Sequence, residues 1–213
     1  MHIPDGYLDL WVAAVCALLA VGTLTYATRR ANGELTDARA PVLGIVAAGL
    51  FAAQMLNWPI PGGTSAHFVG GAFAAILLGP HLGALCVATV VTIQALVFGD
   101  GGLVVLGANV LNMAVVEVYV GYAVYRLLAG HGEFAAAFGA GWIGITAGAL
   151  AAGLQLGVSE AFAYELVTTL SIMGAGHLVL GLIEGAITAV VYRYVADARP
   201  DIFPGTPQRE VGA

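Results

Sequence analysis

Apolar stretches of about 20 residues recur along most of this 213-residue chain, and each can cross roughly 30 Å of bilayer hydrocarbon. Only 9% of the residues are charged, whereas a soluble domain carries roughly 25%. Such a chain would expose far too much apolar surface in water. We therefore expect an all-α integral membrane protein whose solvent is the lipid bilayer.

Glycine and proline clusters separate the apolar stretches into seven expected spans. They lie at about residues 9–28, 40–58, 64–79, 82–98, 104–128, 135–157 and 168–195. Glycines four residues apart, such as Gly144 and Gly148 or Gly181 and Gly185, are expected to let helices of the chain pack closely.

The positive charges predict the orientation of the bundle. The chain has seven arginines and no lysine. The arginines are Arg29, Arg30, Arg39, Arg126, Arg193, Arg199 and Arg209. With seven spans, an outside N-terminus and a cytoplasmic C-terminus, all of them lie in the cytoplasm, as the positive-inside rule requires. The outer face then carries only acidic charges, which attract cations. These are Asp5, Asp9, Asp100, Glu160 and Glu165.

Several classes of protein are excluded or disfavoured. A P-loop needs a lysine, so ATP hydrolysis, if it drives this protein, belongs to separate subunits. The HExxH and GxSxG motifs of hydrolases are absent from the sequence, so a hydrolase is disfavoured. Cys16 and Cys86 form no disulfide or zinc pattern, and nothing in the charge indicates nucleic-acid binding. Because the first residues are acidic, we expect no cleaved signal peptide and a native N-terminus.

The first two residues, Met1-His2, form a candidate chelate. The Met1 α-amine, the His2 amide nitrogen and the His2 Nδ1 close a five-membered and a six-membered ring on one ion. Nitrogen-rich, tetragonal sites favour Ni(II) or Cu(II). The α-amine has to lose its proton before it can bind.

His67 is the candidate for the open fourth position. By the expected topology His2 and His67 share the outer face, whereas His81 and His131 lie in inner loops and His177 lies within the last span. The alternatives stay open that His2 binds nothing and that His67 is an ordinary cap or interface residue, since either motif alone is weak.

Three segments together resemble a known family. MHIPDGYL at 1–8, GGTSAHFVGG at 62–71 and QALVFGDGGLVVLGANVLNMAVV at 94–116 are similar to the CbiM/NikM family, the cobalt- and nickel-binding S components of energy-coupling-factor transporters. The resemblance implies a seven-helix fold whose N-terminal segment inserts at the extracytoplasmic side. It also implies a near-planar site for transported Ni(II) or Co(II), formed by the Met1 amine, the amide and imidazole of His2, and the His67 imidazole. No organic cofactor is expected.

The same resemblance implies partners in the cell membrane. They are a transmembrane T component, ATPase subunits and a small accessory membrane subunit, which we expect to be a separate protein. The expected organisation is an extracytoplasmic metal-binding segment at 1–8, a transmembrane domain at 9–198 and a cytoplasmic tail at 199–213. The implied role is uptake of nickel or cobalt, the latter for cobalamin biosynthesis.

Other polar residues are candidates for supporting roles. Asp5, Ser65 and Asn109 are candidates for contacts that orient the ligands. Asp5 also has the plainer interpretation of a loop acid. Buried helical carboxylates are usually paired or functional, and we expect Glu117 and Glu184 to serve hydrogen-bonded packing or subunit docking rather than a relay with His177. Interhelical hydrogen bonds are expected from Gln94, Asn109, Asn112 and Gln155.

Two other functions remain as alternatives. A channel or secondary transporter for another solute would carry these histidines incidentally, and blocking its N-terminal amine would be harmless. A structural membrane subunit would bind no metal. Between the two metals, the planar nitrogen set favours nickel on coordination grounds.

Overall fold

The computed structural model describes residues 1–37 and 39–203. The helices are α1 (Leu10–Ala31), α2 (Arg39–Gln54), α3 (Gly71–Leu78), α4 (Pro80–Ile93), α5 (Leu106–Val110), α6 (Val118–Leu128), α7 (Glu133–Gly157) and α8 (Leu166–Ala198). Strands β1 (Asn57–Pro59) and β2 (Ser65–His67) pair antiparallel. The π-helical turns η1 (Gln94–Phe98) and η2 (Leu111–Glu117) extend α4 and join α5 to α6. Short 3₁₀ turns are η3 (Ala129–His131) and η4 (Pro200–Ile202).

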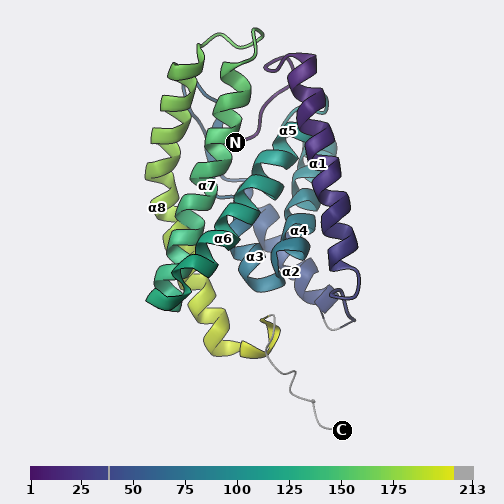
Figure 1. Ribbon diagram of the computed structural model, residues 1–213, viewed down its shortest axis with the longest axis vertical. Coiled ribbons are helices and arrows are strands. Elements are labelled where there is room, and N and C mark those ends of the chain that lie inside the picture. Colours follow the sequence, from purple (N-terminus) through teal and green to yellow (C-terminus); the bar gives the residue numbers. More distant parts are fainter. Residues whose placement is uncertain (38, 204–213) are drawn as a thin grey trace.

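The helices run along the long axis of the molecule as a single bundle (Figure 1). Within the described residues, five helical stretches are long and apolar enough to cross a membrane. They are Leu10–Ala31, Pro80–Phe98, Leu106–His131, Glu133–Gly157 and Leu166–Ala198. The protein is therefore a multi-pass helical membrane protein, as its composition predicts.

The expected spans two and three differ most from the structure. The second ends early, at Gln54, and the expected span at 64–79 is not one helix, because residues 65–67 form β2 and only Gly71–Leu78 is helical. At 1.5 Å per residue these eight residues cover about 12 Å. The glycines and prolines between residues 59 and 63 favour the hairpin, and Gly70, at φ 74°, starts the short helix. A count of seven spans stays a prediction.

Glycines allow the closest helix contacts. A Cβ on Gly185 of α8 would lie 2.6 Å from the Phe138 carbonyl of α7, and one on Gly181 would lie 2.7 Å from the Trp142 side chain. A Cβ on Gly148 of α7 would lie 2.9 Å from the carbonyl oxygen of Asn112 in η2. These glycine pairs serve packing within the chain, as predicted.

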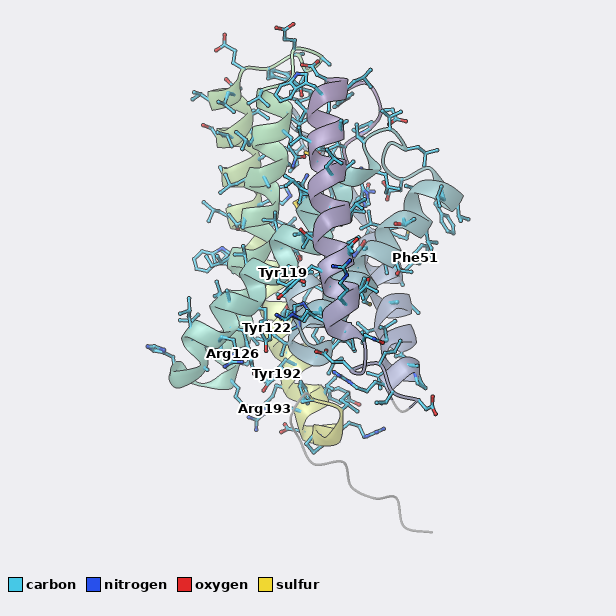
Figure 2. The ribbon with its side chains drawn as sticks, turned by 45° about the vertical axis from the view of Figure 1, so that its right-hand side comes forward. Phe51, Tyr119, Tyr122, Arg126, Tyr192 and Arg193 are labelled. Atoms are coloured by element: carbon cyan, nitrogen blue, oxygen red, sulfur yellow. The ribbon has the colours of Figure 1, made fainter. Side chains whose placement is uncertain are left out.

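Arginines gather at one end of the bundle, named here the arginine end. Arg29 and Arg30 end α1, and the Arg39 guanidinium donates to the carbonyl of Leu78 at the end of α3. Figure 2 shows Arg126 and Arg193 toward the same end. Arg209 and the other residues of the expected tail from 204 onward lie outside the described residues. The side of the membrane on which this end lies stays a prediction from the charge rule.

The opposite end receives the N-terminus. The chain start lies among the helices rather than beyond them (Figure 1), and Met1 and Ile3 are fully buried. Residues 1–9, named here the N-terminal segment, are therefore buried at Met1, His2, Ile3 and Leu8, whereas residues 4–7 are exposed.

Candidate metal site

Asn109 of α5 holds the N-terminal segment by its main chain. Its Oδ1 accepts the Ile3 N–H at 2.8 Å, and its Nδ2 donates to the Ile3 carbonyl at 3.0 Å. The Gly102 N–H donates to the same carbonyl at 2.9 Å. Asn109 is fully buried, so these bonds form away from water. The side chain therefore fixes the residue next to His2, whereas the sequence predicted for Asn109 both an interhelical bond and a supporting contact at the metal pocket.

Two acidic residues of the N-terminal segment bind main-chain N–H groups. The Asp5 carboxylate accepts from Leu103 at 3.1 Å and from Val104 at 2.9 Å, in the turn that leads into α5. The Asp9 carboxylate accepts from Glu160 and Ala161, at 3.0 and 3.1 Å, in the loop before α8. Asp5 thus anchors a neighbouring loop and makes no hydrogen bond to the candidate ligands. Asp9 was not singled out as a site residue from the sequence.

Met1, His2 and His67 come together at the inner tip of this segment. The His2 and His67 rings stack with their centroids 4.7 Å apart and their planes 19° apart. The Met1 amine donates to the Ser65 Oγ at 3.1 Å, two residues before His67 on β2. Residues separated by more than 60 positions therefore form one cluster, and Ser65 touches the amine directly.

The ring nitrogens of both histidines suit metal binding. His67 Nδ1 lies 2.9 Å from the Phe68 carbonyl, which makes it the protonated nitrogen and leaves the Nε2 lone pair free. Among the described residues that buried Nε2 has no hydrogen-bond partner, and the same holds for both ring nitrogens of His2. Buried polar atoms without partners are rare, so these nitrogens are available to accept a ligand.

Asp100, in the loop after η1, lies beside the cluster. Its Oδ2 is 3.6 Å from the His2 Nε2. A carboxylate in this place favours the His2 tautomer with its proton on Nε2, which leaves Nδ1 for a metal. Sequence reasoning placed Asp100 only in the acidic outer rim. The glycine-rich sequence Gly99-Asp100-Gly101-Gly102 could have indicated that Asp100 lies beside the cluster. Its Gly101 and Gly102 allow His2 and Asp5 to approach this loop closely.

Burial keeps the candidate ligands neutral. It lowers the pKa of the Met1 amine from 8.0 to about 4, against the opposing charges of Asp100, Glu117 and Glu184. Burial, and then the charge of the amine, lowers the pKa of His2 to about 3 and that of His67 well below 6.5. At neutral pH the amine and both imidazoles therefore present lone pairs, which a cation requires of its ligands.

A hollow of about 510 Å³ borders the cluster. Its lining includes His2, Asp5, Tyr7, Asn57, Ser65 and Asp100. Among the described residues, no three His, Cys, Asp or Glu side chains gather to hold a metal.

The remaining polar residues take different roles. Asn112 and Gln155 exchange two hydrogen bonds, of 2.8 and 2.6 Å, between η2 and α7, which confirms that prediction. The buried Gln94 amide has no hydrogen-bond partner within the described residues, so no interhelical bond is found for it there. Glu117 and Glu184 accept main-chain N–H groups, in agreement with hydrogen-bonded packing. His177 is fully buried, and its Nδ1 lies 2.9 Å from the Met173 carbonyl.

Comparison with known proteins identifies close relatives. The family model described as "Cobalt uptake substrate-specific transmembrane region" matches residues 2–202. A putative metal transport protein of Haloquadratum walsbyi is 61% identical over 202 residues, which cover 95% of this chain and 93% of that protein. A putative fused nickel transport protein NikMN of Archaeoglobus fulgidus is 58% identical, with 95% of this chain and 68% of that protein covered.

A solved structure has the same fold. The crystal structure of a truncated transition metal transporter superposes with a TM-score of 0.90 at 36% identity. The match covers 93% of this chain and 99% of the other.

Proposed function

This chain belongs to the CbiM family of cobalt uptake substrate-specific transmembrane regions, and from that premise we propose that it captures a nickel or cobalt ion for import through its first two residues and His67. Its relatives carry the names of nickel, cobalt and metal transport proteins. The members of this family are components of transport systems. The role of the chain is therefore to bind an ion and pass it on rather than to catalyse a reaction.

The proposed ligands are the Met1 amine, the His2 amide nitrogen, the His2 Nδ1 and the His67 Nε2. The observation that carries the proposal is that the stacked His2 and His67 rings place buried nitrogens, which have no hydrogen-bond partner among residues 1–37 and 39–203, beside the N-terminal amine. The ion replaces the hydrogen bonds that these atoms lack. A set of four nitrogens, one of them a deprotonated amide, favours a planar complex of Ni(II) over a complex of Co(II).

Import needs energy from elsewhere. The chain has no lysine for a P-loop, which supports an energy-coupling-factor system in which ATPase subunits act through a T component and a small accessory membrane subunit. In this system the ion enters from the extracytoplasmic face through the hollow beside His2. The charge rule supports that orientation, because the arginine end then faces the cytoplasm.

Metal titration of the purified protein with a free N-terminus tests the proposal. We expect one Ni(II) ion per chain, with the absorption spectrum of a planar nitrogen complex. His2→Ala, His67→Ala or acetylation of the amine is expected to abolish this spectrum. His131→Ala is the matched control, because this exposed histidine lies in η3 after α6, at the arginine end.

Cells provide the second measurement. Nickel and cobalt uptake by cells that express the full system should fall to background in the His2 and His67 variants and stay normal in His131→Ala. Normal uptake and binding by either ligand variant, at normal expression, would exclude the proposed site. Normal binding after acetylation would exclude the amine as a ligand.

A further inference from the structure

The segment that follows His67 is bound by two buried carboxyl groups. Glu184 of α8 accepts the Val69 N–H at its Oε2 (2.9 Å) and the Gly70 N–H at its Oε1 (2.8 Å). Glu117, at the end of η2, accepts the Gly71 N–H at 2.8 Å. Both glutamates are at most 1% exposed. A carboxylate that uses both oxygens as acceptors is well matched to two neighbouring N–H donors.

These contacts satisfy the beginning of α3. The first N–H groups of a helix have no partner within the helix, and negative charge is stabilising there. The approach is close, since a Cβ on Gly71 would lie 2.8 Å from the Glu117 Oε1. Side chains of η2 and α8 therefore hold the chain between β2 and α3, together with Gln54 of α2, whose Nε2 donates to the Val69 carbonyl at 2.8 Å.

One of these bonds continues to the metal ligand. The Val69 N–H that binds Glu184 belongs to the same peptide group as the Phe68 carbonyl, and this carbonyl faces the Nδ1 of His67. A continuous series of hydrogen bonds thus runs from the Glu184 carboxylate through one peptide group to the imidazole. Partners of this kind on the far nitrogen of a ligating histidine fix the ring and raise its basicity. Hydrogen bonds in series also polarise one another.

We propose that Glu184 is a positioning residue of the metal site, which sets the orientation of His67 through the Phe68–Val69 peptide group. The proposal rests on the proposed function, in which His67 is a ligand. Glu117 holds the next N–H along and has no bond to that peptide group. Since Glu184 belongs to α8, which continues to the arginine end, this contact directly links that end of the bundle to a metal ligand.

Glu184→Gln tests the proposal because its amide group places a donor opposite one of the two N–H groups. We expect the affinity for Ni(II) to fall by about 10- to 100-fold, the usual effect of losing such a partner. At saturating Ni(II), we expect an absorption spectrum that differs from that of the wild type, because the His67 imidazole no longer has its wild-type orientation at the ion.

Glu117→Gln is the comparison within the same cluster. The Glu117 and Glu184 carboxyl groups also hydrogen-bond to each other. In Glu117→Gln the side-chain carbonyl oxygen can still accept the Gly71 N–H and the amide can still donate to Glu184, so we expect the wild-type spectrum. Glu165→Gln is the outer control, since this exposed glutamate before α8 makes no capping hydrogen bond through its side chain. Thermal unfolding in detergent shows whether each variant is folded. If Glu184→Gln does not fold, Glu184→Asp replaces it, with the same expected spectrum because the shorter side chain cannot reach both N–H groups.

The outcomes separate the two proposals. Loss of binding in His67→Ala together with wild-type affinity in Glu184→Gln would overturn the role of Glu184 alone. Weak binding with a wild-type spectrum at saturation would also overturn it, because His67 would then be in place. Absence of Ni(II) binding by the wild type would instead overturn the proposed function.

Discussion

Replacing Asn109 with alanine is expected to release the N-terminal segment. The variant loses both hydrogen bonds to the Ile3 main chain, but the carbonyl keeps the bond from Gly102 at 2.9 Å. The Ile3 N–H is left buried without a partner, which costs about 1–3 kcal/mol. With a tenfold change for each 1.4 kcal/mol, the open fraction of the segment rises by about 5- to 150-fold.

The composition of the chain provides a specific assay for this opening. Because there is no lysine, the Met1 α-amine is its only primary amine. The amine is buried, so an amine-reactive ester labels the protein only when the segment opens. The labelling rate, followed by mass spectrometry at constant pH, is therefore proportional to the open fraction when opening and closing are fast. Bound Ni(II) should slow the labelling in the wild type.

Asn112→Ala is the matched control for that measurement. Asn112 is also fully buried and lies three residues further along, but its amide bonds Gln155 rather than the N-terminal segment. We expect its labelling rate to stay near that of the wild type. Labelling of Asn109→Ala within twofold of the wild type, or an equal increase in both variants, would refute the assignment of Asn109 as the anchor of residue 3.

Three further predictions address the same cluster. The Met1 amine and His2 have pKa values of about 4 and 3 when buried but about 8.0 and 6.5 when free, so the open state of the segment binds more protons than the docked state. Docking of the segment should therefore be strongest above about pH 8 and should weaken as the pH falls toward 4. Hydrogen exchange of residues 2 and 3 measures this, and protection that rises on acidification would contradict the prediction. Asp100→Asn removes the carboxylate that lies 3.6 Å from the His2 Nε2 and should lower the Ni(II) affinity by about 10- to 100-fold. Asp37→Asn, at an exposed residue, is the control. Unchanged Ni(II) affinity of Asp100→Asn in a titration would exclude a role of Asp100 in orienting His2. Gly102→Ala brings a methyl group 2.6 Å from the Asp5 Cγ and should cost about 1–3 kcal/mol of the free energy with which the segment docks, which would be seen as faster labelling of Met1. In Gly130→Ala the added methyl group has no neighbouring atom within 4 Å, so this variant should label as slowly as the wild type.

Much of the architecture was predictable because membrane solvation acts on each segment separately. Apolar length predicts helices wherever a stretch can satisfy its own main chain in lipid. The same approach placed the helix boundary wrongly at residues 64–79, where only Gly71–Leu78 is helical. There the glycines and prolines favour a hairpin whose pairing between Asn57 and His67 no local pattern reports.

The candidate site divides in the same way. Met1 and His2 were identified by chelate chemistry, which involves adjacent atoms. Asn109 was named from the sequence as a candidate for a supporting role, but its bond to Ile3 and the roles of Asp100 and Glu184 were harder to find, because these side chains act on main-chain or ring atoms about 100 residues away. A side-chain amide or carboxylate has the same letter in the sequence whether it binds another helix, a loop or a ligand.

The amino-acid sequence alone determined the solvent, the helical class, the placement of the arginines at one end of the bundle and the chemistry of a Met-His amino end. Only the tertiary structure decided that this end is buried, that the His2 and His67 rings stack, and that Glu184 binds the peptide next to His67. The reason is physical: solvation and chelation depend on neighbouring residues, whereas burial and hydrogen-bond pairing depend on which distant segments the packed bundle brings together.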